Sequence, residues 1–151
     1  MIDGVIVQAL TTHPDDRGYF REIVRDDDRL LERFGQVSIT ETYPGVIKAF
    51  HWHERQDDLW YVASGMAQVV LYDRRPDSPT KGQTDVIYAG EQQPVLIKIP
   101  KGVAHGYRVL GQQSVVLVYV TTASYQPTQP DEQRIPFDDP TIGFDWATQH
   151  R

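Results

Sequence analysis

Short runs of β-favouring residues, separated by turn residues, occupy nearly the whole chain and constrain its fold more than any other feature. The runs are rich in Val, Ile, Tyr and Thr, and Gly, Pro or Asp separates them, which is typical of strands joined by turns. We predict strands at residues 4–10, 19–24, 36–42, 46–53, 59–63, 67–72, 84–88, 95–99, 105–110 and 114–122. Helical periodicity is almost absent. Only Asp26 to Phe34 is expected to form a short helix, with Leu30, Leu31 and Phe34 as its apolar face.

Many short strands with a single short helix favour a sandwich or a barrel. The length of 151 residues suits one domain, spanning residues 1–151. We therefore predict an all-β double-stranded β-helix, the cupin jelly roll, in which inward-facing side chains enclose a ligand cavity. From about residue 126 the chain is rich in Pro, Asp and Gln, and this segment is expected to pack as an irregular strap.

Composition excludes several classes of protein. The chain has no cysteine, which removes disulfides, iron–sulfur ligation and a thiol nucleophile. Lys+Arg 15 against Asp+Glu 21 gives a net charge of −6, which argues against a nucleic-acid surface but leaves room for a local basic pocket. The longest nearly apolar run, residues 115–120, is far shorter than the roughly 20 residues of a membrane span. The N-terminus resembles no signal peptide, so we expect a cytoplasmic protein.

The histidines are the most informative side chains for function. His51 and His53 are two residues apart in a predicted strand, so both side chains face the same side of the sheet. With His105 and the carboxylate of Asp58, they form a suitable ligand set for a divalent transition metal. The alternative is that the histidines are hydrogen-bonded polar residues of a barrel, or edge residues, and that Asp57 and Asp58 are an ordinary solvated pair.

Two segments resemble the conserved motifs of the cupin fold. Gly45, His51, His53, an acid at position 58 and Gly65 have the spacing of the first motif, although metal-binding cupins usually carry Glu at the acidic position. Residues 100–105, with the sequence PKGVAH, resemble the second motif, which brings a third His from another strand.

A more extensive resemblance, over nearly the whole chain, is to the dTDP-4-dehydrorhamnose 3,5-epimerase family. The similar segments are DRGYFRE at 16–22, QVSIT at 36–40, KAFH at 48–51, DRR followed by SPTKG at 73–82, PKGVAHGY at 100–107 and the ending from 137 to 146. The resemblance implies an isomerase that acts on a nucleotide-linked 4-keto-6-deoxy sugar, in a homodimer, without a cofactor. The SPTKG segment is expected to be structural, and Arg74 and Arg75 to lie exposed in the turn before it.

The resemblance also implies roles for individual residues. His51 would remove the proton next to the ketone, and Tyr119 would return a proton from the opposite face, as epimerisation requires. Arg17 would contact a nucleotide phosphate, and the family pattern allows this contact to cross a subunit interface. The residues assigned to substrate binding are Arg17, Phe20, Glu22, Gln36, Ser38, Lys48, His105 and Tyr125.

Four departures from the family pattern stand out. Asp58 lies where the family has a Lys that holds the enolate, and Lys48 replaces an Arg, losing its bidentate fork. His53 replaces a Gln. The family also supplies an acid that orients the catalytic His from a segment beyond its final Trp, whereas this chain ends at Arg151; on that ground we expect the acid to be missing.

These departures leave three hypotheses open. In the first, the isomerase works through His51, or through His51 and His53 together, since AFHWH at 49–53 resembles the G-F-H-x-H segment of nucleotide-sugar 3,4-ketoisomerases. In the second, a metal held by His51, His53, Asp58 and His105 supplies Lewis-acid chemistry for a metal-dependent cupin enzyme, and His51 is then not a free base. In the third, the protein binds a sugar nucleotide without turnover.

Overall fold

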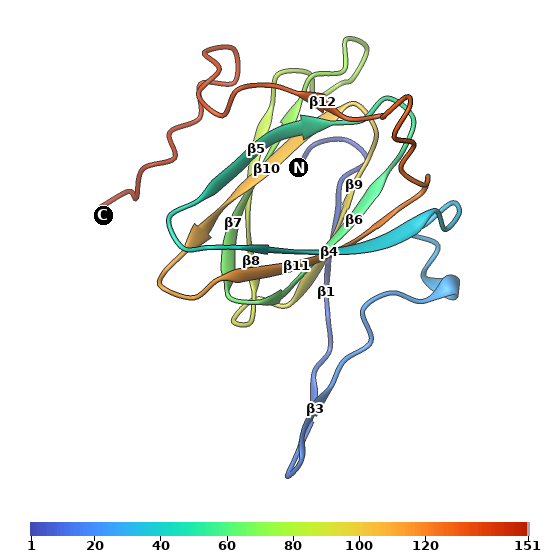
Figure 1. Cartoon of the computed structure of the whole chain (residues 1–151), viewed down its shortest axis with the longest axis vertical. Helices are drawn as coiled ribbons and strands as arrows, with labels where there is room; N and C mark the ends of the chain where they lie inside the picture. Colours follow the sequence, from blue (N-terminus) through green and yellow to red (C-terminus); the bar gives the residue numbers. More distant parts are fainter. Residues whose placement is uncertain (151) are drawn as a thin grey trace.

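Two antiparallel sheets pack face to face in the computed structural model, which describes residues 1–150 (Figure 1). The first sheet contains, in spatial order, β1 (Ile6–Ala9), β9 (Val95–Ile99), β6 (Asp58–Ser64), β11 (Val115–Thr121) and β4 (Gln36–Thr42). The second contains β12 (Gln133–Arg134), β5 (Ile47–Trp52), β10 (Val103–Leu110), β7 (Met66–Asp73) and β8 (Thr84–Gly90). This arrangement confirms the predicted all-β jelly roll.

The main core lies between the two sheets because alternate residues of each strand point inward. In β11, Val115 and Leu117 are 0% and 2% exposed, and the next residue of the same series, Tyr119, packs against this core while remaining half-buried. In β6 the corresponding series is Val62, Trp60 and Asp58, all buried. Both series therefore run from an apolar end of the barrel to a polar end.

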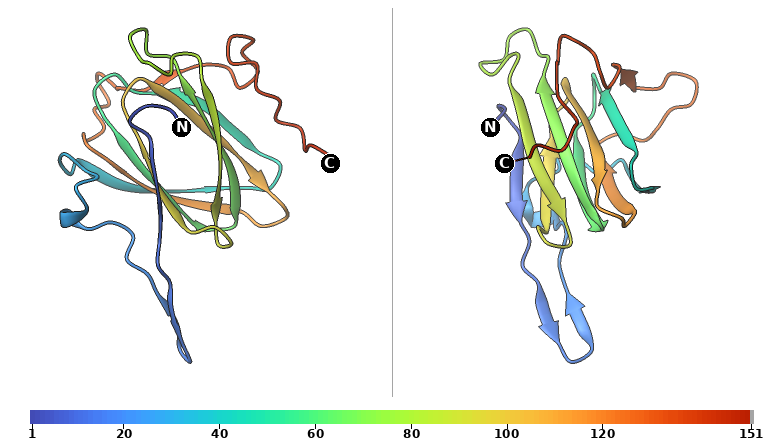
Figure 2. Two further views of the ribbon diagram at one scale, coloured as in Figure 1. Left: turned by 180° about the vertical axis from the view of Figure 1, so that it is seen from behind. Right: turned by 90° about the vertical axis from the view of Figure 1, so that its left-hand side faces the viewer.

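The predicted strands match the structure closely, with one exception and two omissions. The strand predicted at 19–24 ends at Phe20, because β3 (Gly18–Phe20) pairs only with β2 (His13–Asp15) in a separate hairpin. We did not predict β2 or β12. Figures 1 and 2 show the hairpin projecting away from the two sheets.

The helix predicted over Asp26 to Phe34 is wrong. The segment forms one short 3-10 turn, η1 (Asp26–Asp28), which ends where Arg29 adopts a left-handed conformation with φ 56°. Leu30 then packs into a second apolar cluster with residues of β6 and β9, whereas Phe34 is 67% exposed. The three apolar residues were expected to share one helical face, but only Leu30 and Leu31 pack on this cluster, because the chain leaves the helical path at Arg29.

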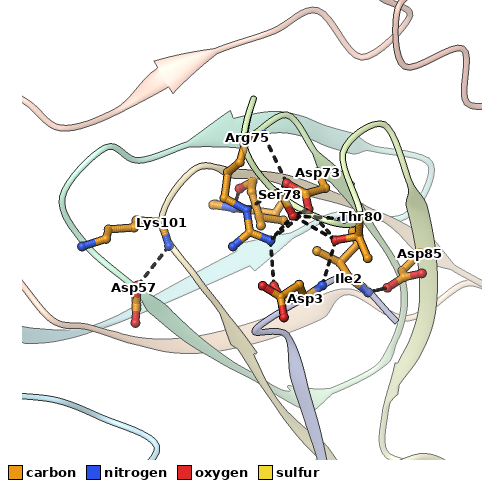
Figure 3. Close-up of polar contacts among 11 residues, drawn as sticks. Ile2, Asp3, Asp57, Asp73, Arg75, Ser78, Thr80, Asp85 and Lys101 are labelled. Atoms are coloured by element: carbon orange, nitrogen blue, oxygen red, sulfur yellow. Dashed lines mark hydrogen bonds and ion pairs between the residues drawn. The ribbon is translucent and has the colours of Figure 1, made fainter.

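A buried carboxylate organises the turn after β7 (Figure 3). Asp73 is 0% exposed and accepts hydrogen bonds from Arg75, Ser78 and Thr80. Arg75 also donates to the backbone carbonyl of Asp3, which ties the N-terminal segment to this turn. The SPTKG segment thus has a structural role, as predicted.

The two arginines of this turn are half-buried, so the expectation that they are exposed is wrong. Arg75 is held by Asp73, and the guanidinium of Arg74 lies 3.5 Å from the ring centroid of Trp52. Cation–π stacking of this kind favours Arg because its planar group lies flat on the ring.

The segment after β11 crosses the second sheet and adds β12 to its edge, beside β5 (Figure 1). Backbone hydrogen bonds join Ile135 and Phe50 in both directions. Farther along, Trp146 packs on Phe50 and donates from its indole nitrogen to the carbonyl of Phe137. The predicted strap is therefore mostly irregular but firmly attached to β5. Within residues 1–150, no helix has the length and apolar character needed to cross a membrane.

Candidate active site

The polar end of the barrel opens into a cavity of about 1430 Å³. The predicted residues that line it are His51, His53, Asp58, His105, Tyr119, Gln36, Lys48 and Tyr125. They come from both sheets and from the strap, so the fold brings together side chains that are far apart in the sequence.

The cavity is polar because four strands place polar residues at corresponding inward positions. Asp58 of β6 pairs with Thr121 of β11, and His105 of β10 pairs with His51 of β5. The β10–β5 pairing has a bulge immediately after His105, at Gly106. A Cβ atom at Gly106 would lie 2.3 Å from the Cβ of Ala49, so glycine is what allows these strands to approach closely beside the two histidines.

His51 lies in hydrogen-bond contact with an acid that we did not predict. Its Nδ1 lies 2.7 Å from Oε1 of Glu132, and both side chains are about one-third exposed. Glu132 immediately precedes β12, whose residue Arg134 pairs with His51 in register. The expectation that the acid orienting His51 is missing is therefore wrong, because the strap supplies it from a position before the final Trp.

The Glu132 contact fixes how the His51 ring can be protonated. Nδ1 faces the carboxylate and carries the proton of the neutral ring, which leaves Nε2 as the basic nitrogen. Burial lowers the pKa of His51, and the opposing charge of Glu132 offsets this only in part. The side chain is thus a neutral base at neutral pH, with a carboxylate ready to stabilise the imidazolium that forms when it takes a proton.

A second cluster in the cavity comprises His53, Asp58 and His105. The Nε2 atoms of the two histidines lie 3.5 and 3.8 Å from Oδ2 of Asp58. Asp58 is 3% exposed and His105 also 3% exposed. Asp58 is therefore buried, and the alternative hypothesis that it is an ordinary solvated residue is wrong. The cluster includes three of the four residues predicted to bind a metal. The fourth, His51, contacts Glu132 instead.

Burial and charge act in opposite directions within this cluster. Burial lowers the pKa of His105 to about 4, which keeps this ring neutral. Burial also lowers the pKa of His53, but the adjacent negative charge of Asp58 outweighs it and the net shift is upward. Burial raises the pKa of Asp58, but the contacts with His53 and His105 lower it by more, so the net shift is downward. The carboxylate is consequently ionised.

Four predicted substrate-binding residues lie outside this cavity. Arg17, Phe20 and Glu22 belong to the projecting hairpin and the segment after it, where the Arg17 side chain is 84% exposed and Glu22 pairs with Arg25. Within one chain, the structure does not bring these three to the other site residues. Ser38 does not line the cavity. It accepts a hydrogen bond from Gln36, which does line it.

Several residues that line the cavity were not predicted from the sequence. The most important are Glu132, Asp131 and Gln56, together with the arginines Arg33, Arg55 and Arg134. Asp131 holds the loop after β5, because its carboxylate accepts the backbone N–H groups of Glu54 and Arg55. Asp131 and Glu132 are adjacent in the sequence, but their partners depend on where the strap pairs with β5.

Comparison with known proteins gives a consistent result. A family model described as dTDP-4-dehydrorhamnose 3,5-epimerase matches residues 1–151. The chain is 65% identical to the spore coat polysaccharide biosynthesis protein SpsL of Bacillus subtilis, over 100% of both chains. It is 31% identical to the dTDP-4-dehydrorhamnose 3,5-epimerase of Methanothermobacter thermautotrophicus, over 98% of this chain and 82% of that relative.

Solved structures agree with the sequence relatives. A dTDP sugar isomerase from Desulfovibrio desulfuricans superposes with a TM-score of 0.90 at 28% identity, covering 99% of this chain and 94% of that one. The dTDP-6-deoxy-D-glucose-3,5-epimerase of Legionella pneumophila, solved with dTDP-4-keto-L-rhamnose, superposes with a TM-score of 0.88 at 28% identity and covers 100% of this chain and 82% of that one.

Proposed function

The chain belongs to the dTDP-4-dehydrorhamnose 3,5-epimerase family, and on that premise we propose that His51 and Tyr119 epimerise a dTDP-linked 4-keto-6-deoxy sugar. In this reaction His51 removes a proton from a carbon next to the ketone, and Tyr119 donates a proton to the same carbon from the other side. Inversion needs both groups, since a single base returning its own proton would restore the original configuration.

The observation that carries this proposal is the contact between His51 and Glu132. A carboxylate at Nδ1 holds an imidazole in one tautomer and stabilises the positive charge that proton abstraction creates. The 2.7 Å separation is that of a charge-assisted hydrogen bond. The third hypothesis, binding without turnover, depended partly on the absence of this acid and loses that support.

The placement of Tyr119 supports its role as the acid. Tyr119 belongs to β11 in the first sheet and His51 to β5 in the second, and both line the same cavity. A sugar bound between the sheets therefore has the base on one side and the phenol on the other. This arrangement suits inversion at carbon better than transfer between neighbouring carbons by two histidines of one strand.

His53 is poorly placed for the ketoisomerase variant of the mechanism. Its Nδ1 donates to the backbone carbonyl of Asp131, and its Nε2 faces Asp58. Both nitrogens are thus directed at protein groups, whereas a proton shuttle needs one of them free for the substrate.

Basic side chains at the cavity provide for the diphosphate of the nucleotide. Arg33, Lys48, Arg55 and Arg134 all line it, and Lys48 is held at the rim by Thr40. A local concentration of positive charge attracts a phosphorylated ligand even when the whole protein is negative.

We also propose that the protein is a homodimer in which the hairpin β2–β3 reaches the partner's cavity. The hairpin leaves the body of its own chain (Figure 2) and exposes Tyr19 and Phe20 at 60% and 63%. Edge strand β4 likewise exposes Val37 and Ile39. Apolar surface of this extent is typical of an interface. The cytoplasmic location stays a prediction.

Solvent isotope exchange tests the proposed reaction. We expect the protein, incubated with dTDP-4-keto-6-deoxyglucose in heavy water, to introduce deuterium at carbons 3 and 5 of the sugar, as mass spectrometry and NMR would show. His51→Asn should abolish the exchange, whereas His150→Asn, outside the cavity, should leave it unchanged. Absence of deuterium at both carbons with the folded wild-type protein would refute the proposal.

A further inference from the structure

We propose that His53, Asp58 and His105 form a binding site for one divalent transition-metal ion. Their ligand atoms, Nε2 of each histidine and a carboxylate oxygen, lie within 4.8 Å of one another. Metal binding at this site does not depend on the proposed epimerase reaction. It rests on the backbone contacts of the two rings, on the spacing of the three atoms and on the contacts that hold the carboxylate.

The outer nitrogen of each ring is committed to a backbone carbonyl. Nδ1 of His53 contacts the carbonyl oxygen of Asp131, and Nδ1 of His105 lies 3.0 Å from the carbonyl oxygen of Val103. A carbonyl oxygen only accepts hydrogen bonds, so Nδ1 carries the proton in both rings. Each neutral ring then presents the lone pair of Nε2, and both lone pairs lie beside the same carboxylate. Ligating histidines characteristically donate their other N–H to a carbonyl in this way.

The spacing suits a shared cation better than direct hydrogen bonds. The two Nε2 atoms are 3.5 and 3.8 Å from Oδ2 of Asp58, which exceeds the normal hydrogen-bond range. Two ligands that are each about 2.1 Å from a tetrahedral metal lie roughly 3.4 Å apart. An ion between these atoms would therefore need only small side-chain movements to reach its usual bond lengths.

The carboxylate of Asp58 is oriented by two further side chains. Gln56 donates to Oδ1 at 3.0 Å, and the indole of Trp60 donates to Oδ2 at 3.2 Å. Trp60 also packs edge-on against the ring of His105, with centroids 5.0 Å apart. Hydrogen-bonded carboxylates of this kind are typical of metal ligands, and the packing limits the freedom that metal binding would have to remove.

Two imidazoles and one carboxylate select the class of ion. This donor set suits Zn²⁺, Fe²⁺, Mn²⁺, Co²⁺ or Ni²⁺, and the lack of any thiolate disfavours soft ions such as Cu⁺. Three protein ligands leave further coordination positions open. His51 is not part of the set, because the ligand atoms that lie within 4.8 Å of one another belong to His53, Asp58 and His105. A bound ion and a free catalytic base are therefore compatible, in contrast to the four-ligand hypothesis drawn from the sequence.

The consequence for the reaction rests on the proposed function. Asp58 is an ionised carboxylate that lines the same cavity as His51 and Tyr119, so its negative charge would oppose the formation of an anionic enolate there. A divalent ion on Asp58 would restore positive charge to this part of the cavity. It would do so as a Lewis acid toward an oxygen of the substrate.

Cobalt binding provides the test. Tag-free protein, stripped with a chelator and returned to metal-free buffer at pH 7.5, would be titrated with Co²⁺ and followed by visible absorption. We expect one Co²⁺ per chain, with d–d bands that Zn²⁺ displaces. Asp58→Asn and His53→Gln should each weaken binding by more than about 100-fold, since even changes behind the ligands commonly cost about 10- to 100-fold. His150→Asn, which removes a histidine outside the cavity, should bind as the wild type does.

Two results would overturn the proposal. The first is that the folded wild-type protein binds neither Co²⁺ nor Zn²⁺, and the second is that the Asp58→Asn and His53→Gln variants bind Co²⁺ as tightly as the wild type. Circular dichroism identifies folded variants, and if Asp58→Asn does not fold, His53→Gln alone decides. Deuterium exchange measured on both the metal-free and the metal-loaded protein separates the two proposals. Exchange without metal binding overturns only the metal site, and metal binding with no exchange by either form overturns only the epimerase reaction.

Discussion

Individual residues show which parts of the site could be predicted from sequence. His51, His53 and His105 were found because their spacing and residue type carry information without the fold. Glu132 was missed because its role comes from contact with His51, which lies in a distant part of the sequence. Asp58 was seen as a departure, but its burial and its contact with His105 depend on the packing of the two sheets.

Replacing Glu132 tests the positioning of the base. We expect Glu132→Gln to lower kcat about 10²- to 10⁴-fold with a small change in KM, because the amide can accept the His51 N–H but adds no charge to stabilise the imidazolium. Steady-state kinetics would measure both constants. Glu32→Gln, an exposed acid outside the cavity, serves as the control. A change confined to KM would contradict the assigned role.

Tyr119→Phe separates proton removal from proton return. The variant keeps the ring that packs against the core and loses only the hydroxyl, so we expect folding to be preserved. His51 should still exchange substrate protons with solvent, while inversion falls by about 10²-fold or more. NMR in heavy water would then show deuterium in unchanged substrate with little epimer formed. Undiminished epimer formation would exclude Tyr119 as the acid.

At the level of elements, regular patterns were predictable and irregular ones were not. β4 and β9 have the predicted bounds, because alternating or continuous β-branched residues identify strands that are at least half-buried. The segment around Leu30 resembled a helix because of its apolar spacing. Its actual path is decided by packing on β6 and β9, which no local pattern encodes.

The close approach of β5 and β10 predicts that position 106 requires glycine. Gly106→Ala would place a methyl group against Ala49 and the carbonyl of Lys48, so the strands must separate. We expect a loss of about 1–3 kcal/mol or more in the free energy of unfolding, the usual cost of overpacking, measured by urea denaturation. Gly111→Asn is the control, because its position has φ 73° and open space, and Asn tolerates that conformation. Equal stability of the two variants would show that β5 adjusts freely.

The turn after β7 predicts a specific dependence of stability on pH. Burial by itself raises the pKa of Asp73, but hydrogen bonds from Arg75, Ser78 and Thr80 outweigh it and hold the pKa well below its usual range. A depressed pKa in the folded state adds stability above the unfolded pKa of about 3.9, and this stability is lost as the pH falls toward the folded pKa.

We therefore expect Asp73→Asn to lower the free energy of unfolding by about 3 kcal/mol at pH 7, as for other broken buried ion pairs. The difference from wild type should shrink as the pH falls below about 4. Urea denaturation at pH 7 and at pH 3.5 would measure it. Asp77→Asn, an exposed acid in the same turn, should show no such convergence, and a difference independent of pH would contradict the assignment.

For the whole molecule, the jelly roll and its cavity followed from the sequence, whereas the role across a subunit interface that the resemblance implies for Arg17 stays a prediction. Arg17 and Phe20 were assigned to the site, and one chain does not bring them to the cavity. The exposed apolar residues of the hairpin and of β4 are explained together if a second chain covers them.

Mixing two inactive variants tests whether the hairpin acts across the dimer. In a hybrid of Arg17→Ala and His51→Asn chains, the chain that keeps His51 receives an intact Arg17 from its partner, so one of the two sites is native. Random exchange of subunits should then restore about a quarter of wild-type activity, and light scattering should report the mass of a dimer. If Arg17 serves its own chain, every site in the hybrid carries one defect and mixing restores nothing. Activity that stays at the sum of the two separate variants would therefore rule out the crossed arrangement.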